Sequence, residues 1–202
     1  MFFLPSFFCQ PATVEDDDLQ LLNTDIQLWV ALKNGDKDAL GLLFSRYYPI
    51  LIRYGSKFCN DQAKLEDCIQ DLFAEIWQST ARPELQSVKA YLLKALKYKI
   101  YRRKSRNITD EIGDDLFELS HDHLLIHKED ERIRVNRLMD AMNDLPARQR
   151  EIIYLKIYQE LSYEEISEVM NINYQVARNL FSQALGTLRK IILLVAVLSG
   201  LT

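Results

Sequence analysis

Five polar side chains near the end of the chain have the types and the spacing needed to recognise bases in duplex DNA. They are Gln175, Arg178, Asn179, Ser182 and Gln183. Arginine hydrogen-bonds to guanine, and the side-chain amides hydrogen-bond to adenine, in the major groove. On a helix these five positions share the outer face, and the apolar residues at four-residue intervals are predicted to point inward. Those inward residues are Val176, Leu180 and Ala184.

Two short helices are predicted to position these side chains. Ser162 and Glu165 have the spacing of a capping box, so a helix is expected to begin at Tyr163. Its apolar pattern breaks at residues 171–173, where asparagine tolerates the left-handed backbone that ends a helix. Asn173 can then cap the helix that carries the polar face. Two helices joined by about three residues, the second polar on its outer face, predict a helix-turn-helix.

The alternative is a pair of amphipathic helices in an ordinary bundle, with outer faces that are polar only because they meet water. Solvated faces usually carry many Glu and Lys side chains. The outer positions of the second helix carry no acidic residue and consist mostly of amide and guanidinium groups. This composition favours base recognition.

Charge is segregated along the chain, although the total is only −4. Residues 87–106 contain eight basic residues and no acid, whereas residues 107–131 contain nine acids and one lysine. Tyr91, Tyr98 and Tyr101 lie between the basic residues, a combination that suits single-stranded DNA because rings stack on unpaired bases. The alternative is a solvated helix whose lysines extend their stems over apolar surface.

Apolar periodicity and few glycines and prolines predict an all-α chain with two small helical domains. In the first domain, helices are expected over residues 25–33, 36–59 with a kink at Pro49, 61–78 and 87–105. The third of these has an unbroken apolar stripe that indicates core. The stripe contains Leu65, Cys68, Ile69, Leu72, Phe73, Ile76 and Trp77.

The predicted domain organisation has five parts. They are a mobile tail over 1–23, a helical domain over 24–106, an acidic linker over 107–130, the helix-turn-helix domain over 131–190 and an apolar tail over 191–202. The last tail has about half the apolar length that a bilayer-spanning helix needs, so it is expected to be buried against protein. Three cysteines without paired short spacing favour a reducing cytoplasm.

No pattern for catalysis is present. The sequence has no phosphate-binding glycine loop, no nucleophile elbow and no zinc-protease motif, so we expect neither an enzyme nor a cofactor. His121, His123 and His127 could hold a metal, but no fourth ligand or supporting cysteine is near them in sequence. We therefore expect no metal site and no small-molecule substrate.

The order of these features resembles the bacterial extracytoplasmic-function (ECF) sigma factors of the sigma-70 family, over nearly all of residues 24–190. The stretch from Glu66 to Phe73, followed by Trp77, is similar to a motif of the family's region 2. The stretches 145–151 and 161–166 are similar to motifs of its region 4. Residues 144–190 have six basic and six acidic groups, so this domain should bind duplex weakly by itself and need a larger partner.

The resemblance implies three binding surfaces and three partners. The partners are core RNA polymerase, through its clamp helices and flap, promoter DNA, and an anti-sigma factor. Docking on polymerase is implied for Asp67, Gln70, Asp71 and Glu75. Opening and reading of the −10 element is implied for the loop 79–86 and the basic helix, with Arg82, Lys94, Lys97, Tyr98, Tyr101, Arg102 and Arg103. Reading of the −35 element is implied for the helix from Tyr174 to Leu188, with Tyr174, Gln175, Arg178, Asn179, Ser182 and Gln183.

Two other functions fit parts of the sequence. A stand-alone helix-turn-helix regulator would bind a two-fold operator as a symmetric dimer. A helical adaptor would bind proteins and have no effect on DNA. Run-off transcription with purified core polymerase and a candidate promoter separates all three.

Overall fold

The described structure is entirely helical. The computed structural model describes residues 24–79, 83–105, 117–118 and 140–199, and every regular element in them is a helix. The predicted all-α class is confirmed. The expectations for the tail 1–23, for the three histidines and for most of the linker fall outside the described residues. Among the described helices, none combines the length and the apolar character needed to cross a bilayer.

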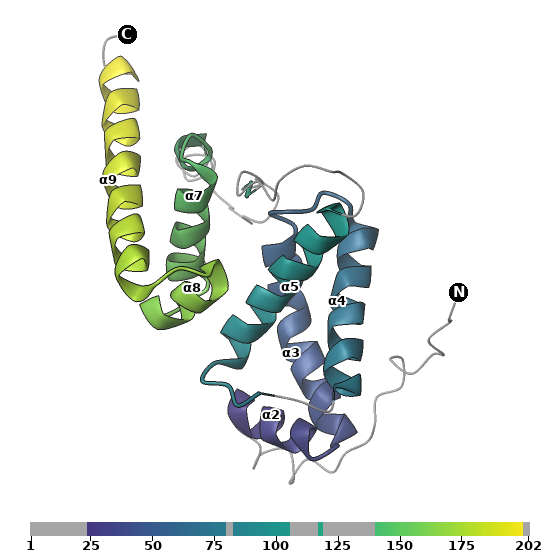
Figure 1. Ribbon diagram of the computed structural model, residues 1–202. Coiled ribbons are helices and arrows are strands. Elements are labelled where there is room, and N and C mark those ends of the chain that lie inside the picture. The colour runs from purple at the N-terminus through teal and green to yellow at the C-terminus, as the bar shows by residue number, and fades with distance from the viewer. Residues whose placement is uncertain (1–23, 80–82, 106–116, 119–139, 200–202) are drawn as a thin grey trace, which may run out of the picture.

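Four helices form the first bundle. They are α2 (Asp25–Lys33), α3 (Lys37–Gly55), α4 (Gln62–Gln78) and α5 (Val88–Ser105). Figure 1 shows α3 and α4 side by side, α5 crossing in front of α3, and α2 closing the lower end. The predicted helix over 36–59 is shorter than expected, and it continues through Pro49 and ends at Gly55.

Side chains in the sequence cap the helix starts of this bundle. Thr24 and Gln27 form a reciprocal capping box at α2, which satisfies two amide groups that the helix leaves unpaired. The Asp36 carboxylate accepts from two amides of α3, and the Asp61 carboxylate accepts from the amide of Lys64 in α4. These caps fix the ends of the helices that carry the candidate binding residues.

The core of the first bundle is aliphatic and aromatic, and its helices approach closely. Fully buried residues come from all four helices and include Leu28, Leu43, Leu51, Leu65, Ile69, Phe73, Leu92 and Leu96. A Cβ atom added at Gly55 would lie 2.3 Å from Cδ1 of Leu65. A larger residue at position 55 would force the Leu65 side chain to shift, so glycine lets the end of α3 pass close to the start of α4.

The second bundle contains the predicted helix-turn-helix. Its described elements are α7 (Ala147–Ile153), the π-helical turn η3 (Tyr154–Tyr158), α8 (Tyr163–Met170) and α9 (Tyr174–Ser199). The reading helix, implied over 174–188, continues without interruption in α9 to Ser199. Residues 189–199 contain no glycine or proline, so no backbone signal ends the helix earlier. Ile191 is half-buried, and the expected burial of the rest of the apolar tail stays a prediction.

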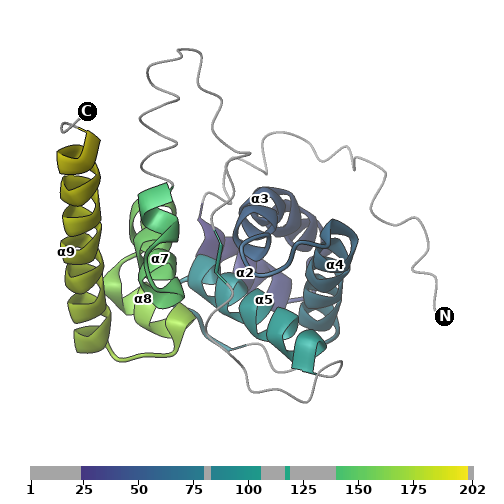
Figure 2. The same ribbon diagram turned by 90° about the horizontal axis from the view of Figure 1, so that it is seen from above.

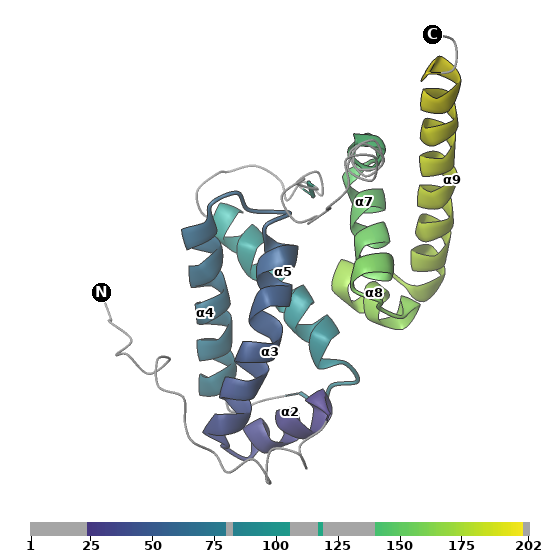
Figure 3. The ribbon, with the colours of Figure 1, turned by 180° about the vertical axis from the view of Figure 1, so that it is seen from behind.

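The two bundles pack against each other. Figures 2 and 3 show α7 and α8 between α9 and the first bundle, and α8 contacts α5. Phe117, from the segment predicted to be an acidic linker, is fully buried between Tyr54, Phe58 and Tyr154. Arg150 donates a hydrogen bond to the Phe117 carbonyl, and the Glu118 amide donates to the Lys57 carbonyl. This short part of the linker thus contacts both bundles.

Candidate nucleic-acid interface

The turn between α8 and α9 forms as the sequence predicts. Ser162 and Glu165 make both hydrogen bonds of the capping box at the start of α8. Asn171 ends α8 with a positive φ of 52°, in the left-handed region that asparagine tolerates. The Asn173 side chain accepts a 2.8 Å hydrogen bond from the amide of Val176 and so caps α9. These caps fix the direction in which α9 leaves the turn.

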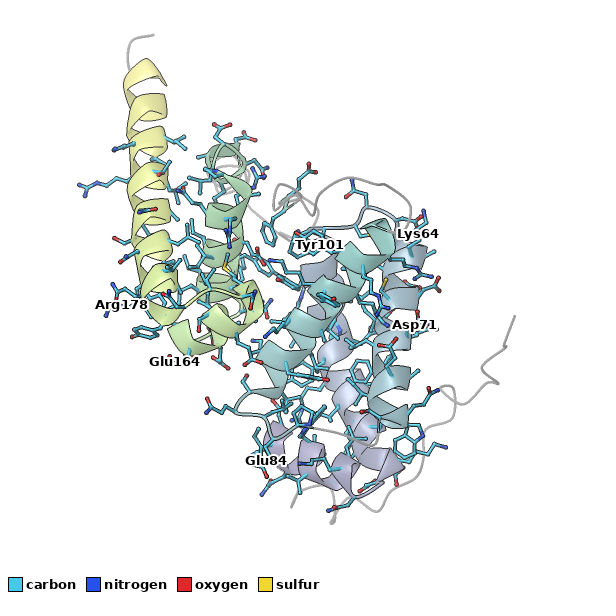
Figure 4. All side chains as sticks on the ribbon, in the orientation of Figure 1. Lys64, Asp71, Glu84, Tyr101, Glu164 and Arg178 are labelled. Carbon is cyan, nitrogen blue, oxygen red and sulfur yellow. The ribbon has the colours of Figure 1, made fainter. Side chains whose placement is uncertain are left out.

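All six residues predicted to read the −35 element are exposed on α9. They are Tyr174, Gln175, Arg178, Asn179, Ser182 and Gln183. Figure 4 shows Arg178 pointing away from the rest of the protein at the outer side of α9. The Arg178 guanidinium lies 5.8 Å from the centre of the Tyr174 ring. The side-chain amide of Gln175 donates a 3.1 Å hydrogen bond from Nε2 to the side-chain oxygen Oδ1 of Asn179. The reading face therefore contains a guanidinium over a ring and a paired set of amides.

The predicted buried side of α9 is partly wrong. Val176 is 43% exposed, Leu180 is only half-buried, and the fully buried residues are Ala177 and Ala184. Ala177 and Ala184 are seven residues apart, which is about two helical turns, whereas Val176 and Ala184 are eight residues apart, which is well beyond two turns. Ala177 and Ala184 therefore share a face, and Val176 is rotated out of it. The small alanines allow α9 to approach α7 and α8.

Aromatic contacts hold α9 against α8. The Tyr163 ring meets the rings of Tyr174 at 6.0 Å and Phe181 at 6.1 Å, both in edge arrangements. Nζ of Lys156 lies 4.8 Å from the centre of the same Tyr163 ring and donates to the Leu161 carbonyl. Edge contacts of this kind contribute beyond their buried area, so the reading helix is held by side chains as well as by the turn.

The basic helix α5 divides into exposed and buried parts. Lys94, Tyr98 and Arg102 are exposed, as a role in DNA binding requires. Lys97 instead pairs with Glu151 of the second bundle, and only 12% of its side chain is exposed. Tyr101 is 9% exposed, and its ring packs against the Phe58 ring at 5.7 Å. Tyr101 lies between the two bundles in Figure 4. The predicted −10 residues therefore do not form one continuous surface in this conformation.

The two remaining −10 candidates differ in what the structure describes. Arg103 is exposed but donates to the Lys64 carbonyl, and it lies 3.4 Å from the Asp67 carboxylate on α4. Arg82 lies outside the described residues. The next part of its loop is anchored, because Trp29 donates a 2.9 Å hydrogen bond to the Pro83 carbonyl.

A buried ionic network joins the bundles, and sequence reasoning missed it. The Glu151 carboxylate of α7 accepts from the Tyr54 hydroxyl at 2.7 Å and from Nζ of Lys97 at 2.8 Å. Glu151 is 3% exposed. Burial and the adjacent Glu151 charge raise the pKa of Tyr54 well above its usual value, so the phenol remains a donor. The available sequence signal was an acid directly before the apolar pair Ile152-Ile153.

Two further polar contacts cross the same interface. Lys89 of α5 donates a 2.6 Å hydrogen bond to the Gln159 carbonyl, and burial lowers the pKa of Lys89. Burial by itself would raise the pKa of Glu165, but hydrogen bonds with Ser87 and Ser162 bring it below its usual value. Glu165 therefore serves the capping box of α8 and the contact with α5 together.

The four predicted polymerase-binding residues lie on the exposed side of α4. Asp67, Gln70, Asp71 and Glu75 are all exposed, and Figure 4 shows Asp71 on the side of the protein away from Arg178. Glu75 also pairs with Lys99 of α5 at 2.6 Å. Trp77, predicted to be part of the core stripe, is 37% exposed and extends the apolar edge of this face.

No metal cluster is found among the residues that the structure describes. The search for three or more His, Cys, Asp or Glu side chains able to hold an ion gives none there. Cys68 is buried and Cys59 is half-buried, both as free thiols.

Comparison with known proteins identifies related sequences. The family model described as "Sigma-70 region 2" matches residues 43–107, and that described as "Sigma-70, region 4" matches residues 136–188. The "ECF RNA polymerase sigma factor SigK" of Mycobacterium sp. (strain KMS) is 26% identical over 162 residues, which are 77% of this chain and 84% of that protein. SigK of Mycobacterium sp. (strain JLS) has the same values.

Solved structures with a similar arrangement of helices also exist. CnrH, in complex with the cytosolic domain of CnrY, has a TM-score of 0.57 at 18% identity, covering 83% of this chain and 96% of that chain. The sigma factor RpoE from Bartonella quintana, in complex with the anti-sigma factor NepR, has a TM-score of 0.49 at 21% identity. The match covers 89% of this chain and 98% of that chain. The likeness to CnrH shows a shared fold. Since the region 2 and region 4 matches together span more than half of the chain, it belongs to the sigma-70 family, as an ECF sigma factor that directs RNA polymerase to promoters and is not an enzyme.

Proposed function

We propose that this sigma factor divides its contacts among three separate faces. The outer face of α9 reads the −35 element, the exposed side of α5 and the loop before it contact the −10 element, and the outer face of α4 docks on core polymerase. Exposure of all six predicted −35 residues on one helix of the helix-turn-helix is the observation that supports this most strongly. The domain limits 24–106 and 131–190 are part of the same proposal.

Partners and location follow from family membership. Core RNA polymerase is the partner that the family implies, and we propose its clamp helices and flap as the contact points. An anti-sigma factor is the further protein partner that the resemblance implies. A protein that acts with RNA polymerase on the chromosome works in the cytoplasm, where we place this chain. We assign it no cofactor and no small-molecule substrate.

Run-off transcription tests this proposal as a whole. Purified core polymerase is incubated with the full-length chain and a library of promoters randomised at the −35 and −10 elements. Transcripts that depend on the chain are expected from a subset sharing both elements. Binding to a two-fold operator without polymerase, or the absence of any transcript, would instead support the regulator or the adaptor.

Replacing Arg178 or Gln175 with alanine is expected to change the −35 preference. Both side chains are exposed on the first two turns of α9, where helix-turn-helix proteins contact base edges. Loss of one good base contact costs about 1–3 kcal/mol. Transcription across the randomised −35 library measures the preference of each variant. An unchanged profile in both variants would remove these residues from base recognition.

Reversing the charge of Asp71 is expected to weaken polymerase binding without unfolding the chain. Asp71 is exposed on α4, opposite the buried stripe, so Asp71→Arg leaves no cavity. Affinity for core polymerase, measured by fluorescence anisotropy of the labelled chain, should fall at least tenfold. Asp38→Arg makes the same charge change at an exposed position of α3 and serves as the control. Equal affinities for Asp71→Arg and the parent would mean that docking uses another face.

A further inference from the structure

Val176 is an apolar side chain exposed among the polar groups of the reading face. Its 43% exposure contrasts with the complete burial of the next residue, Ala177. Its neighbours on the outer face are Gln175, one residue before, and Asn179, one turn later. A valine with 43% of its surface exposed, at the start of a helix expected to enter a DNA groove, is not explained by core packing alone.

The position of Val176 is fixed by the start of α9. Its amide donates a 2.8 Å hydrogen bond to the Asn173 side chain, so the backbone at this residue is held by the helix cap. A β-branched side chain on a helix adopts essentially one χ1 rotamer, so its two methyl groups point in a set direction. Val176 therefore offers a preorganised apolar surface at the N-terminal end of α9. In helix-turn-helix proteins this end of the second helix lies in the major groove.

Within residues 174–192, the part of α9 whose exposure the structure describes, the other exposed apolar residues do not share this surface. Leu185 and Ile192 are 41% and 43% exposed, but they lie more than two turns further along the helix. The Tyr174 ring already contacts the Tyr163 ring and the Arg178 guanidinium. Val176 is thus a single apolar contact within a polar face, and it is too small a patch to bind another protein.

The chemistry next to Val176 indicates what it would contact. Gln175 and Asn179 are joined by a 3.1 Å hydrogen bond, and side-chain amides of this kind bind the N6 and N7 edge of adenine. The partner of adenine is thymine, which presents a C5-methyl group in the same groove. An amide pair and an aliphatic group side by side therefore match an A·T pair or two adjacent A·T pairs.

We propose that Val176 contacts the C5-methyl group of a thymine in the −35 element, in or next to the A·T pair bound by Gln175 and Asn179. The inference rests on the proposed −35 role of α9 and adds a specificity-determining residue to it. The same reading face would prefer thymine over cytosine at that base, because cytosine has no methyl group and presents an amino donor.

Substitution of thymine by deoxyuridine tests the contact directly, because the two bases differ only by the methyl group. Core polymerase with the full-length chain first selects promoters from the randomised −35 library. Each −35 thymine of a selected promoter is then replaced singly by deoxyuridine, and open-complex formation is measured. With the parent chain, deoxyuridine at one position should lower open-complex formation about three- to fivefold, which is the effect of leaving one methyl group unburied.

The Val176→Ala variant should lose this discrimination. It is expected to use the thymine and deoxyuridine promoters equally well, with an unchanged melting temperature because the residue is exposed. Leu185→Ala, an equally exposed apolar residue of the same helix, should keep the full three- to fivefold difference. Discrimination that persists in Val176→Ala, selected promoters without a −35 thymine, or no sensitive thymine with the parent chain would overturn the proposal.

Failure of this inference can be distinguished from failure of the proposed −35 role. If Arg178→Ala and Gln175→Ala change the −35 profile while the deoxyuridine scan is flat, α9 reads the element without a methyl contact from Val176. If neither variant changes the profile and the scan is flat, α9 is not the reading helix.

Discussion

Replacing Glu151 with alanine is expected to separate the two bundles. The change removes the carboxylate that accepts from Tyr54 and Lys97 and leaves the Lys97 ammonium buried without that partner. Breaking a buried ion pair from one side costs about 3–5 kcal/mol. If the bundles separate, Lys97 returns to water and this cost disappears. The stability lost through the substitution therefore cannot exceed the free energy that holds the bundles together. Domain separation, with the helices retained, is therefore the expected response.

Small-angle scattering and circular dichroism measure this response together. The radius of gyration of Glu151→Ala should rise above that of the parent while the helical signal stays the same. The triple variant Tyr54→Phe, Lys97→Met and Glu151→Leu supplies the control, because replacing all the polar groups of a buried ionic network with apolar groups of similar size is often neutral or stabilising. A Glu151→Ala chain as compact as its parent, with the same resistance to urea, would show that the pair contributes nothing to docking.

Separation of the bundles would also change which surface is open to DNA. Lys97 belongs to the predicted −10 set, but in the docked arrangement its side chain is 12% exposed and paired with Glu151 of the second bundle. Lys89 is likewise engaged by the Gln159 carbonyl. These two lysines lose their partners in the second bundle, and become available to DNA, only when the two bundles separate. We therefore expect Glu151→Ala to bind single-stranded −10 DNA at least as well as the parent chain.

Local signals in the sequence were sufficient to predict the helix-turn-helix. The Ser162 and Glu165 capping box and the asparagines at 171 and 173 act over three or four residues, so their effect can be recognised without knowing the fold. The outer face of α9 followed from the same local geometry. The prediction was wrong about which side of α9 is buried at Val176. Each four-residue step turns slightly more than one full helical turn, so residues spaced in this way drift around the helix, whereas a seven-residue step returns almost to the same face.

Contacts between distant segments could not be predicted in the same way. Tyr54 and Glu151 are 97 residues apart, and nothing near either residue shows that the other is its partner. Phe117 lies in an acidic stretch without periodicity, yet it is fully buried because two separate bundles provide its surroundings. Trp77 has the spacing of the core stripe but lies at its edge, which only the packing of α4 decides. These features depend on tertiary structure.

Replacing Phe73 with alanine is expected to cost about 3–5 kcal/mol of unfolding free energy, the usual loss for a buried phenylalanine. Phe73 is 1% exposed, and its ring meets the edge of the Phe44 ring at 5.1 Å, so the change leaves a cavity between α3 and α4. The two tryptophans of the chain, Trp29 and Trp77, both lie in the first bundle. Tryptophan fluorescence in urea therefore reports the unfolding of that bundle alone.

The comparison of Phe73→Ala with Asp71→Arg separates packing from docking on the same helix. Phe73→Ala should lower the urea midpoint while the folded chain binds polymerase with the affinity of the parent, because Phe73 faces the core. Asp71→Arg should keep the urea midpoint of the parent and lower the affinity for polymerase. Phe73→Leu, which keeps most of the buried volume, should lose much less stability than alanine. A small loss for Phe73→Ala would mean that α3 and α4 can close the cavity. Loss of polymerase binding by a fully folded Phe73→Ala chain would mean that docking depends on the packing beneath the exposed face of α4.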